Sequence, residues 1–106
     1  MTEPPKPRVV RDELVLKAYS LWLVDPGRAI APFRDQERRH EERLLDYERR
    51  RAWMEEEWRD DILRIDSPRF ASYAALLRGV LHERGYAEWC RWVADRLEGD
   101  VSGAGG

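Results

Sequence analysis

The sequence has little cysteine, no long apolar run and almost no net charge, and each shortage excludes a class of protein. A single cysteine, Cys90, excludes an internal disulfide framework and fits a reducing cytoplasm. No uninterrupted apolar stretch approaches the ~20 residues of a membrane span, and residues 1–7 lack the apolar core of a signal peptide. The net charge of −2 is unlike the strong positive excess of a nucleic-acid-binding domain. We therefore expect a cytoplasmic protein.

Motifs for catalysis or metal binding are also missing. The sequence has no glycine-rich phosphate loop and no His-Glu-x-x-His pattern. Its two histidines, His40 and His82, fall on different expected helices without companion ligands. Carboxylates are so abundant that neighbouring pairs do not indicate acid–base catalysis. We expect no enzyme activity, no cofactor and no metal site, and we interpret His40 as a packed histidine and Cys90 as a surface or core thiol.

Tryptophan, by contrast, is abundant, with five residues in a chain of 106. Disordered chains are poor in aromatic residues, so this number indicates real packing surfaces. Charged residues make up 38% of the chain, which leaves little apolar surface for a thick core. The composition therefore predicts one small domain whose charges lie on solvated helix faces.

A short first helix is expected over residues 12–23, after a proline-rich linker over residues 1–11. Asp12 is a plausible N-cap, and the helix is apolar on nearly every side, which predicts burial. Asp25 then caps a second helix whose first residue is Pro26, a position that proline favours.

The second helix is expected to be long, over residues 26–63, with Pro32 kinking it or splitting off its first turns. The charge runs 49–51 and 55–57 indicate a solvated face. Beyond Pro32, spacings of four and three residues alternate along one side, as in a coiled-coil heptad seam formed by Phe33, Glu37, His40, Leu44, Tyr47, Arg51, Met54 and Trp58.

The third helix is expected from Pro68, with Ser67 as its N-cap, to about Leu97. Gly79 and Gly85 weaken its interior, so both are candidate points where another helix crosses closely. Residues 99–106 should form a flexible tail, which limits the folded domain to residues 12–98. No segment has the alternation of a strand, so the fold class is all-α.

These helices cannot form a compact globule, because a helix of ~30 residues is ~45 Å long. We expect a short helix plus two long antiparallel helices with an apolar stripe left over, which predicts a coiled-coil-like homodimer. The residues expected at its interface are Leu14, Leu21, Trp22, Phe33, His40, Leu44, Tyr47, Met54, Trp58, Leu77, Leu81, Trp89 and Trp92.

Several segments, taken in order, resemble one known domain. In residues 36–48, charged residues and a histidine precede Arg-Leu and then Tyr-Glu. The remaining segments are residues 3–7, 11–17, 25–29, 76–80 and 88–92. Their order is similar to that of the C-terminal region of PadR-type transcriptional regulators, also called the virulence-activator alpha C-terminal domain. Pro32 departs from the pattern, since the family usually keeps a helix former there, and the larger departure is the missing winged helix.

The resemblance implies a domain that dimerises through its helices, while an N-terminal winged helix binds DNA and usually represses nearby genes. No winged helix is expected within these residues, so DNA would be bound only through a domain absent from this chain. In some members, aromatic side chains near the dimer interface bind small hydrophobic effectors. For this chain we expect such a pocket at Trp22, Trp53, Trp89 and Trp92.

Two other interpretations stay open. The chain could be a stand-alone helical protein–protein interaction module that only resembles the PadR domain. Direct, non-specific DNA binding through Arg49–Arg51 would require an affinity that depends steeply on salt, and we expect no measurable binding.

Overall fold

The computed structural model describes residues 13–104, and every regular element within them is a helix. The elements are α1 (Glu13–Tyr19), the 3-10 turn η1 (Leu21–Leu23), α2 (Pro26–Trp58), the 3-10 turn η2 (Arg59–Leu63) and α3 (Pro68–Ala104). The expected all-α class, with one short and two long antiparallel helices, is confirmed. The linker expected over residues 1–11 and the cap expected at Asp12 lie outside the described residues. No described helix is both long enough and apolar enough to span a membrane.

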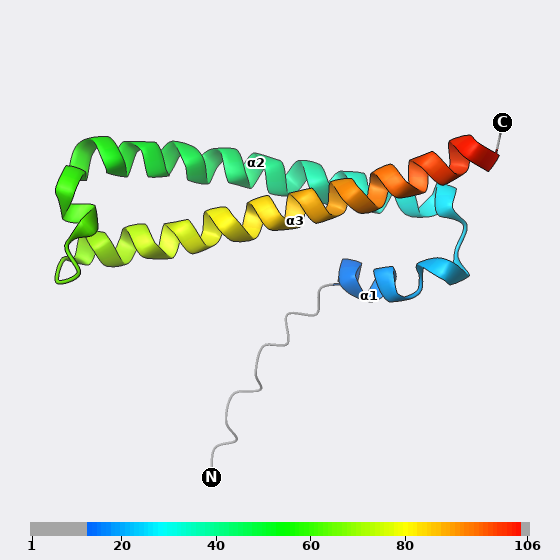
Figure 1. Ribbon diagram of the computed structural model, residues 1–106, viewed down its shortest axis with the longest axis horizontal. Coiled ribbons are helices and arrows are strands. Elements are labelled where there is room, and N and C mark those ends of the chain that lie inside the picture. Colours follow the sequence, from blue (N-terminus) through cyan, green and yellow to red (C-terminus); the bar gives the residue numbers. More distant parts are fainter. Residues whose placement is uncertain (1–12, 105–106) are drawn as a thin grey trace, which may run out of the picture.

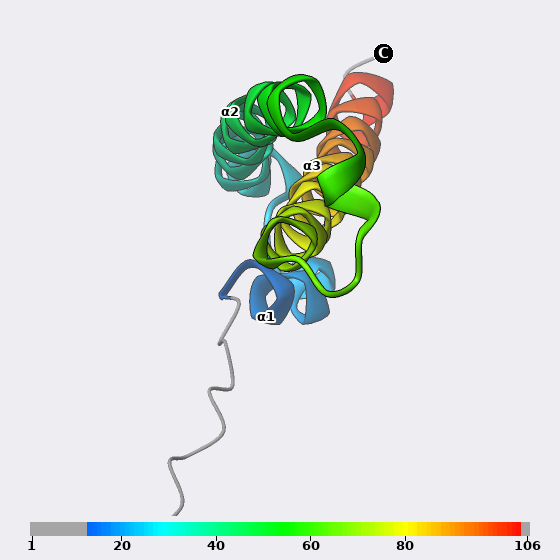
Figure 2. The ribbon, with the colours of Figure 1, turned by 90° about the vertical axis from the view of Figure 1, so that its left-hand side faces the viewer.

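α2 and α3 form an antiparallel hairpin closed by η2, and α1 lies beside its open end, below α3 in both views (Figure 1, Figure 2). The predicted heptad seam of α2 faces α3 of the same chain. Phe33, Glu37, His40 and Met54 on this seam are buried, and the Phe33 ring meets the edge of Trp89 with centroids 5.6 Å apart. The seam therefore holds the hairpin together.

A small apolar core lies at the open end of the hairpin. Its buried members come from all three α-helices: Leu14 from α1, Phe33 from α2, and Cys90, Val93 and Ala94 from α3. Partly buried side chains pack around them: Ala18, Leu21, Tyr86, Trp89 and Leu97. Cys90 is thus a core thiol, and α1 is anchored to the hairpin through one side only.

The prediction that Pro32 splits the second helix is wrong, because α2 continues through it. Pro32 lies in the second turn of α2. Its missing N–H therefore removes one backbone hydrogen bond close to the helix start, where only the first turn precedes it. That start is well anchored. The side chain of Asp25 accepts a hydrogen bond from the backbone N–H of Gly27 at 3.1 Å, and Pro26 occupies the first turn.

α2 ends at Trp58, earlier than the predicted Leu63. Arg59 has a φ of 46° and a ψ of −121°, a backbone conformation that residues other than glycine rarely adopt. This residue ends the α-helical hydrogen bonding, and the chain tightens into the 3-10 turn η2 before it reverses.

α3, in contrast, continues past the predicted end at Leu97 to Ala104. The expected stop relied on Gly99 and Gly103, but a glycine ends a helix mainly when it adopts a positive φ, and no described glycine does so. A glycine inside a helix costs about 1 kcal/mol relative to alanine and weakens it without breaking it. The tail expected over residues 99–106 is therefore helical as far as the structure describes it.

The two glycines expected at helix crossings, Gly79 and Gly85, differ in what lies next to them. A Cβ on Gly79 would lie 3.0 Å from Cε2 of Tyr47, so the absent side chain lets α2 and α3 approach. A Cβ on Gly85 would meet nothing within 4 Å in the described part of the chain. Packing within the chain explains Gly79 but not Gly85.

Candidate functional site

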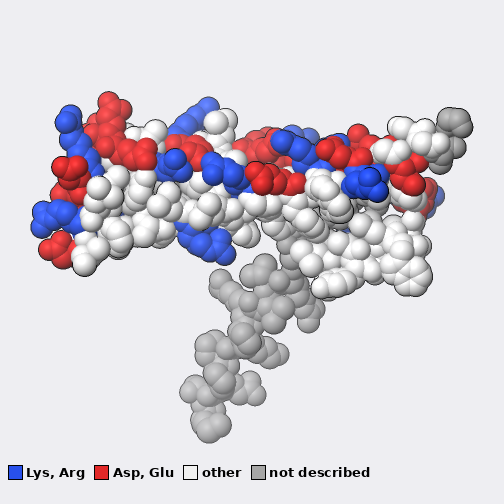
Figure 3. Space-filling view, in the orientation of Figure 1, with Lys and Arg blue, Asp and Glu red and all other residues white. Residues whose placement is uncertain are grey.

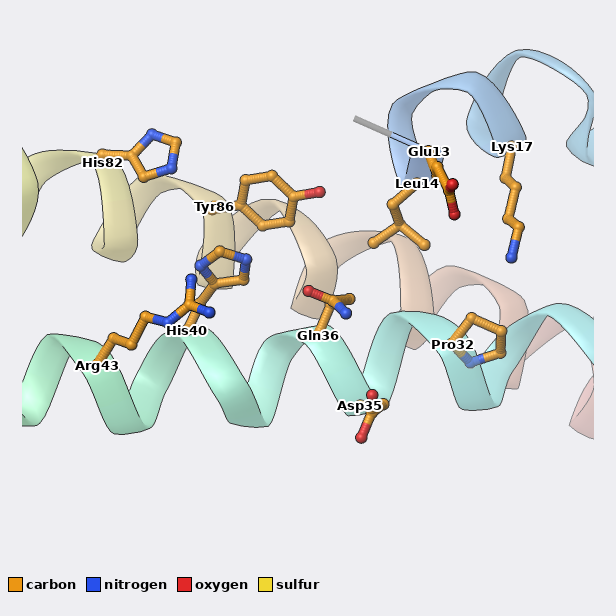
Figure 4. A pocket seen from close by; sticks show the side chains of 10 residues that line it. All are labelled: Glu13, Leu14, Lys17, Pro32, Asp35, Gln36, His40, Arg43, His82 and Tyr86. Carbon is orange, nitrogen blue, oxygen red and sulfur yellow. The ribbon is translucent and has the colours of Figure 1, made fainter. Parts of the chain in front are cut away.

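A cavity of about 440 Å³ opens where α1 meets the hairpin (Figure 4). All three α-helices line it, and most of the lining side chains are polar or aromatic. They are Glu13, Leu14 and Lys17 from α1, Pro32, Asp35, Gln36, His40 and Arg43 from α2, and His82 and Tyr86 from α3. We call this space the α1 cavity.

The inner wall of the α1 cavity is fixed by a buried pair. His40 Nδ1 is hydrogen-bonded to Glu83 Oε2, and both side chains are almost wholly buried. The Tyr86 ring stacks on the His40 imidazole, with centroids 4.0 Å apart and an interplanar angle of 26°. Arg43 Nη1 lies 3.8 Å from the other carboxylate oxygen of Glu83. Because buried polar groups need partners, these contacts set the orientation of His40.

A chain of aromatic rings connects the α1 cavity to the core. The His82 and Tyr86 centroids are 6.0 Å apart, Tyr86 and Trp89 are 5.5 Å apart, and Trp89 and Phe33 are 5.6 Å apart. Edge-to-face contacts at these distances are favourable. A planar molecule bound beside Tyr86 would therefore alter the surroundings of Trp89.

Next to the α1 cavity, charged side chains tie the two long helices together. Arg34 donates to Glu37 at 2.7 Å, to Asp95 at 2.6 Å and to Glu98 at 2.7 Å, and Arg91 donates to Glu37 at 2.9 Å. Burial alone would raise the pKa of Glu37, but the hydrogen bonds from Arg91 and Arg34 hold its pKa below the ordinary value. Glu37 thus contributes stability at neutral pH that is lost as the pH falls through its lowered pKa.

The α1 cavity offers binding rather than a recognisable reaction. It places two cations, Lys17 and Arg43, and two carboxylates, Glu13 and Asp35, around aromatic rings. Asp35 already pairs with arginines on its own helix. Among the described residues, no cluster of three or more His, Cys, Asp or Glu side chains could hold a metal ion. The arrangement suits a small molecule with an aromatic body and polar groups.

The tryptophan pocket expected from the sequence is not formed within one chain. Trp22 is 82% exposed on η1 and Trp92 is 64% exposed on α3, whereas Trp89 is partly buried against the core. Trp53 lies about 30 Å further along α2 than Phe33, at 1.5 Å per residue. There it packs on Trp58, with centroids 5.5 Å apart. The aromatic residues that line the α1 cavity are instead histidines and a tyrosine, so a pocket formed by the four tryptophans stays a prediction for the interface between two copies.

The residues expected at a dimer interface fall into three groups. Helices of the same chain bury Leu14, Phe33, His40 and Met54. Six more are partly buried: Leu21, Leu44, Tyr47, Trp58, Leu77 and Trp89. Only Trp22, Leu81 and Trp92 are exposed. The first group therefore packs against other helices of the same chain, and the exposed group keeps most of its surface accessible to another molecule.

An exposed apolar surface covers α1 and η1, where the sequence predicted a helix buried on all sides. Figure 3 shows few charged side chains over this region, whereas many charged side chains lie along α2. We define the α1–η1 surface by its exposed apolar side chains, which are Val15, Leu16, Tyr19, Trp22, Leu23 and Val24. A hollow of about 500 Å³ lies beside it, between η1 and the start of α2.

The arginine run 49–51 does not form an unpaired basic patch. Arg49 lies 3.9 Å from Asp46, and Arg51 lies between Glu48 and Glu55 at 3.7 and 3.6 Å. These contacts agree with a solvated face rather than a DNA-binding surface.

Residues 10–98 match the family described as virulence activator alpha, C-terminal. The chain therefore belongs to this family, and the resemblance stated from its sequence is confirmed. It is also 28% identical over 100 residues to the negative transcriptional regulator PadR of Bacillus subtilis (strain 168), a match that covers 91% of this chain and 52% of the relative. The chain thus spans about half the length of that relative. No solved structure matches it significantly.

Proposed function

We propose that residues 12–98 form the dimerisation and effector-sensing domain of a PadR-like transcriptional regulator in the cytoplasm. The α1–η1 surface carries the proposal. Soluble monomers rarely expose a contiguous apolar patch of this kind. In a small regulator domain, the simplest way to bury such a patch is an interface with a second copy related by a two-fold axis. The relative that it resembles is a negative regulator of transcription. Repression would follow if a winged helix outside these residues binds DNA and is paired by this domain.

The double variant Trp22→Asp, Leu23→Asp tests the dimer. Both side chains are well exposed, at 82% and 64%, so the variant chain should fold. Two charges in an apolar interface should lower the dimer population at micromolar concentration by at least about tenfold, since each buried unpaired charge costs several kcal/mol. Light scattering gives the mass in solution.

Leu45→Asp is the matched control, because Leu45 is 53% exposed among the charged residues of α2. That variant should stay dimeric. A wild-type chain that is a folded, cooperatively unfolding monomer would overturn the proposed dimer.

We place the effector site at the α1 cavity. Its aromatic rings and polar groups suit a small planar compound, and α1 connects it to the α1–η1 surface. Ligand binding there would shift the position of α1 against the hairpin, and hence the stability of the proposed dimer.

A titration with planar aromatic compounds, followed by tryptophan fluorescence, tests this site. Trp89 should respond saturably because its ring contacts Tyr86. Tyr86→Ala should weaken binding by about tenfold, whereas Trp53→Phe at the far end of α2 should leave the affinity unchanged. A wild-type protein that shows no saturable change across the panel excludes the effector site.

A further inference from the structure

We propose that the hollow between η1 and the start of α2 binds a linear aliphatic carboxylic acid, with the carboxylate at Lys17 and Arg28 and the chain against the apolar walls. The hollow has a volume of about 500 Å³, which is within the usual range for sites that bind small organic molecules. We call it the η1 hollow. It is a site separate from the α1 cavity, and its ligand is independent of the effector proposed there.

Most of the wall of the η1 hollow is apolar. Six of its ten lining residues have apolar side chains: Leu21, Leu23, Val24, Ala29, Pro32 and Phe33. Among the described residues that line it, Phe33 is the one aromatic side chain, and at 1% exposure it offers little ring surface for stacking. The α1 cavity instead offers the rings of Tyr86 and His82. The η1 hollow therefore fits an aliphatic chain better than a planar aromatic body.

Two cations at the rim of the η1 hollow have no anion. Lys17 and Arg28 are exposed, and neither side chain makes an ion pair or a hydrogen bond with another described residue. Arg34, further along α2, shows the contrast, because it contacts three carboxylates. Free cations beside an apolar hollow match a ligand that has an anionic head and an apolar chain.

The other polar groups of the lining favour an anion as well. The carboxylate of Asp25 is already used, because its Oδ1 accepts a hydrogen bond from the N–H of Gly27 at 3.1 Å and caps α2. The Ser20 side chain does not cap η1, so its hydroxyl group can donate to a bound carboxylate. The lining has two positive charges and one negative charge, in a chain whose net charge is −2. A carboxylate is thus favoured over an ammonium head group.

Lys17 and Pro32 lie between the two hollows, since both residues line each of them. Figure 4 shows the Lys17 side chain extending from α1 toward α2. Its ammonium group is therefore placed at the boundary, whereas Arg28 lines the η1 hollow and Tyr86 lines the α1 cavity. Substitutions of Arg28 and Tyr86 can consequently distinguish the two sites.

A carboxylic acid fits the η1 hollow better than a second copy of the chain does. Leu23 and Val24 belong both to the hollow and to the α1–η1 surface, which we propose to be covered in the dimer. The side chains that define this surface are all uncharged, so a second copy packed through the same surface would leave Lys17 and Arg28 without an anion. A carboxylic acid supplies both the apolar chain and the negative charge.

Isothermal titration calorimetry of the wild-type chain tests the class of ligand. Octanoate, decanoate and dodecanoate, each below the concentration at which it forms micelles, should bind with one molecule per chain. Each step of two methylene groups should tighten binding by about four- to fifteenfold, the upper value corresponding to full burial. Decylamine has a chain of the same length with a cationic head, and it should bind at least about tenfold more weakly than decanoate.

Charge variants test the rim. Arg28→Ala and Lys17→Ala should each weaken decanoate binding by about two- to fivefold, because both cations are exposed to solvent. The double variant Lys17→Glu, Arg28→Glu should bind decylamine more tightly than decanoate, a reversal that a loss of fold cannot produce. Arg78→Ala is the matched control, since Arg78 is also exposed and without an ion pair in residues 13–104. It should leave the affinity for decanoate unchanged.

Tyr86→Ala should also leave decanoate binding unchanged, although it weakens the binding of planar compounds at the α1 cavity. Decanoate binding that does not saturate, that exceeds one molecule per chain or that keeps its preference in the double charge variant would overturn the η1 hollow as a ligand site, and the effector site at the α1 cavity would stand. Saturable decanoate binding without any response to planar compounds excludes the α1 cavity alone.

Discussion

Replacing His40 with leucine is expected to destabilise the fold by about 3–5 kcal/mol, because it removes one member of a buried hydrogen-bonded pair. The Glu83 side chain is only 6% exposed, and its nearest other cation, on Arg43, is 3.8 Å away. The carboxyl group would stay buried without its main partner. A loss of this size is a large part of the 5–15 kcal/mol that usually holds a small domain together.

The double variant His40→Leu, Glu83→Met should regain most of that stability, since apolar replacement of a buried pair is often neutral or favourable. Urea unfolding followed by circular dichroism measures all variants, at one protein concentration because the proposed dimerisation would add to stability. Arg38→Ala, at an exposed position of α2, should change the free energy of unfolding by less than about 0.5 kcal/mol. Equal losses in the single and double variants would show that His40 contributes through its shape and not through the pair.

The helix boundaries with clear chemical signals were predicted correctly from sequence. Asp25-Pro26 starts α2, and Ser67-Pro68 starts α3, where Ser67 Oγ accepts a hydrogen bond from the N–H of Arg69 at 3.1 Å. These signals are local, because a capping side chain reaches only two or three residues along the chain. The end of α2 had no comparable signal. An arginine at position 59 does not predict a positive φ, because this conformation is imposed by the reversal of the chain through η2.

The heptad seam of α2 shows a second limit. Its spacing predicted packing along one face, and Phe33, His40 and Met54 are indeed buried there. The same spacing fits packing against a helix of the same chain and packing against a helix of another copy equally well. Sequence periodicity identifies which residues pack, but the length and direction of the connecting turn decide what they pack against.

The α1 cavity was missed for a related reason. It joins Lys17, His40 and Tyr86, which come from three helices and have no fixed spacing between them. The prediction of a ligand pocket relied on tryptophan because this residue is usually rare and is frequent in this chain. Most of the tryptophan side chains, however, are exposed to solvent or packed against the core. The one usable hint was local: His82 and Tyr86 are four residues apart and therefore share a helix face.

Replacing Phe33 with alanine is expected to cost about 3–5 kcal/mol, comparable to the loss of the buried pair. Phe33 is 1% exposed and is the α2 member of the core at which all three α-helices meet. Its ring also meets the edge of Trp89, a contact that adds about 0.5–1.5 kcal/mol beyond buried area.

The Phe33→Ala variant should therefore lose the packing of α1 before the hairpin itself unfolds, because Leu14, the buried residue of α1, belongs to this core. Hydrogen exchange should show it as faster exchange at Leu14 and Ala18 than in residues 70–80, and urea unfolding gives the total loss. Phe33→Leu keeps most of the volume and should cost less than half as much, whereas Leu45→Ala, on the exposed side of α2, should cost under about 1 kcal/mol. If α1 stays protected in Phe33→Ala, then something other than this core holds it, and the proposed contact of the α1–η1 surface with a second copy is the first explanation to test.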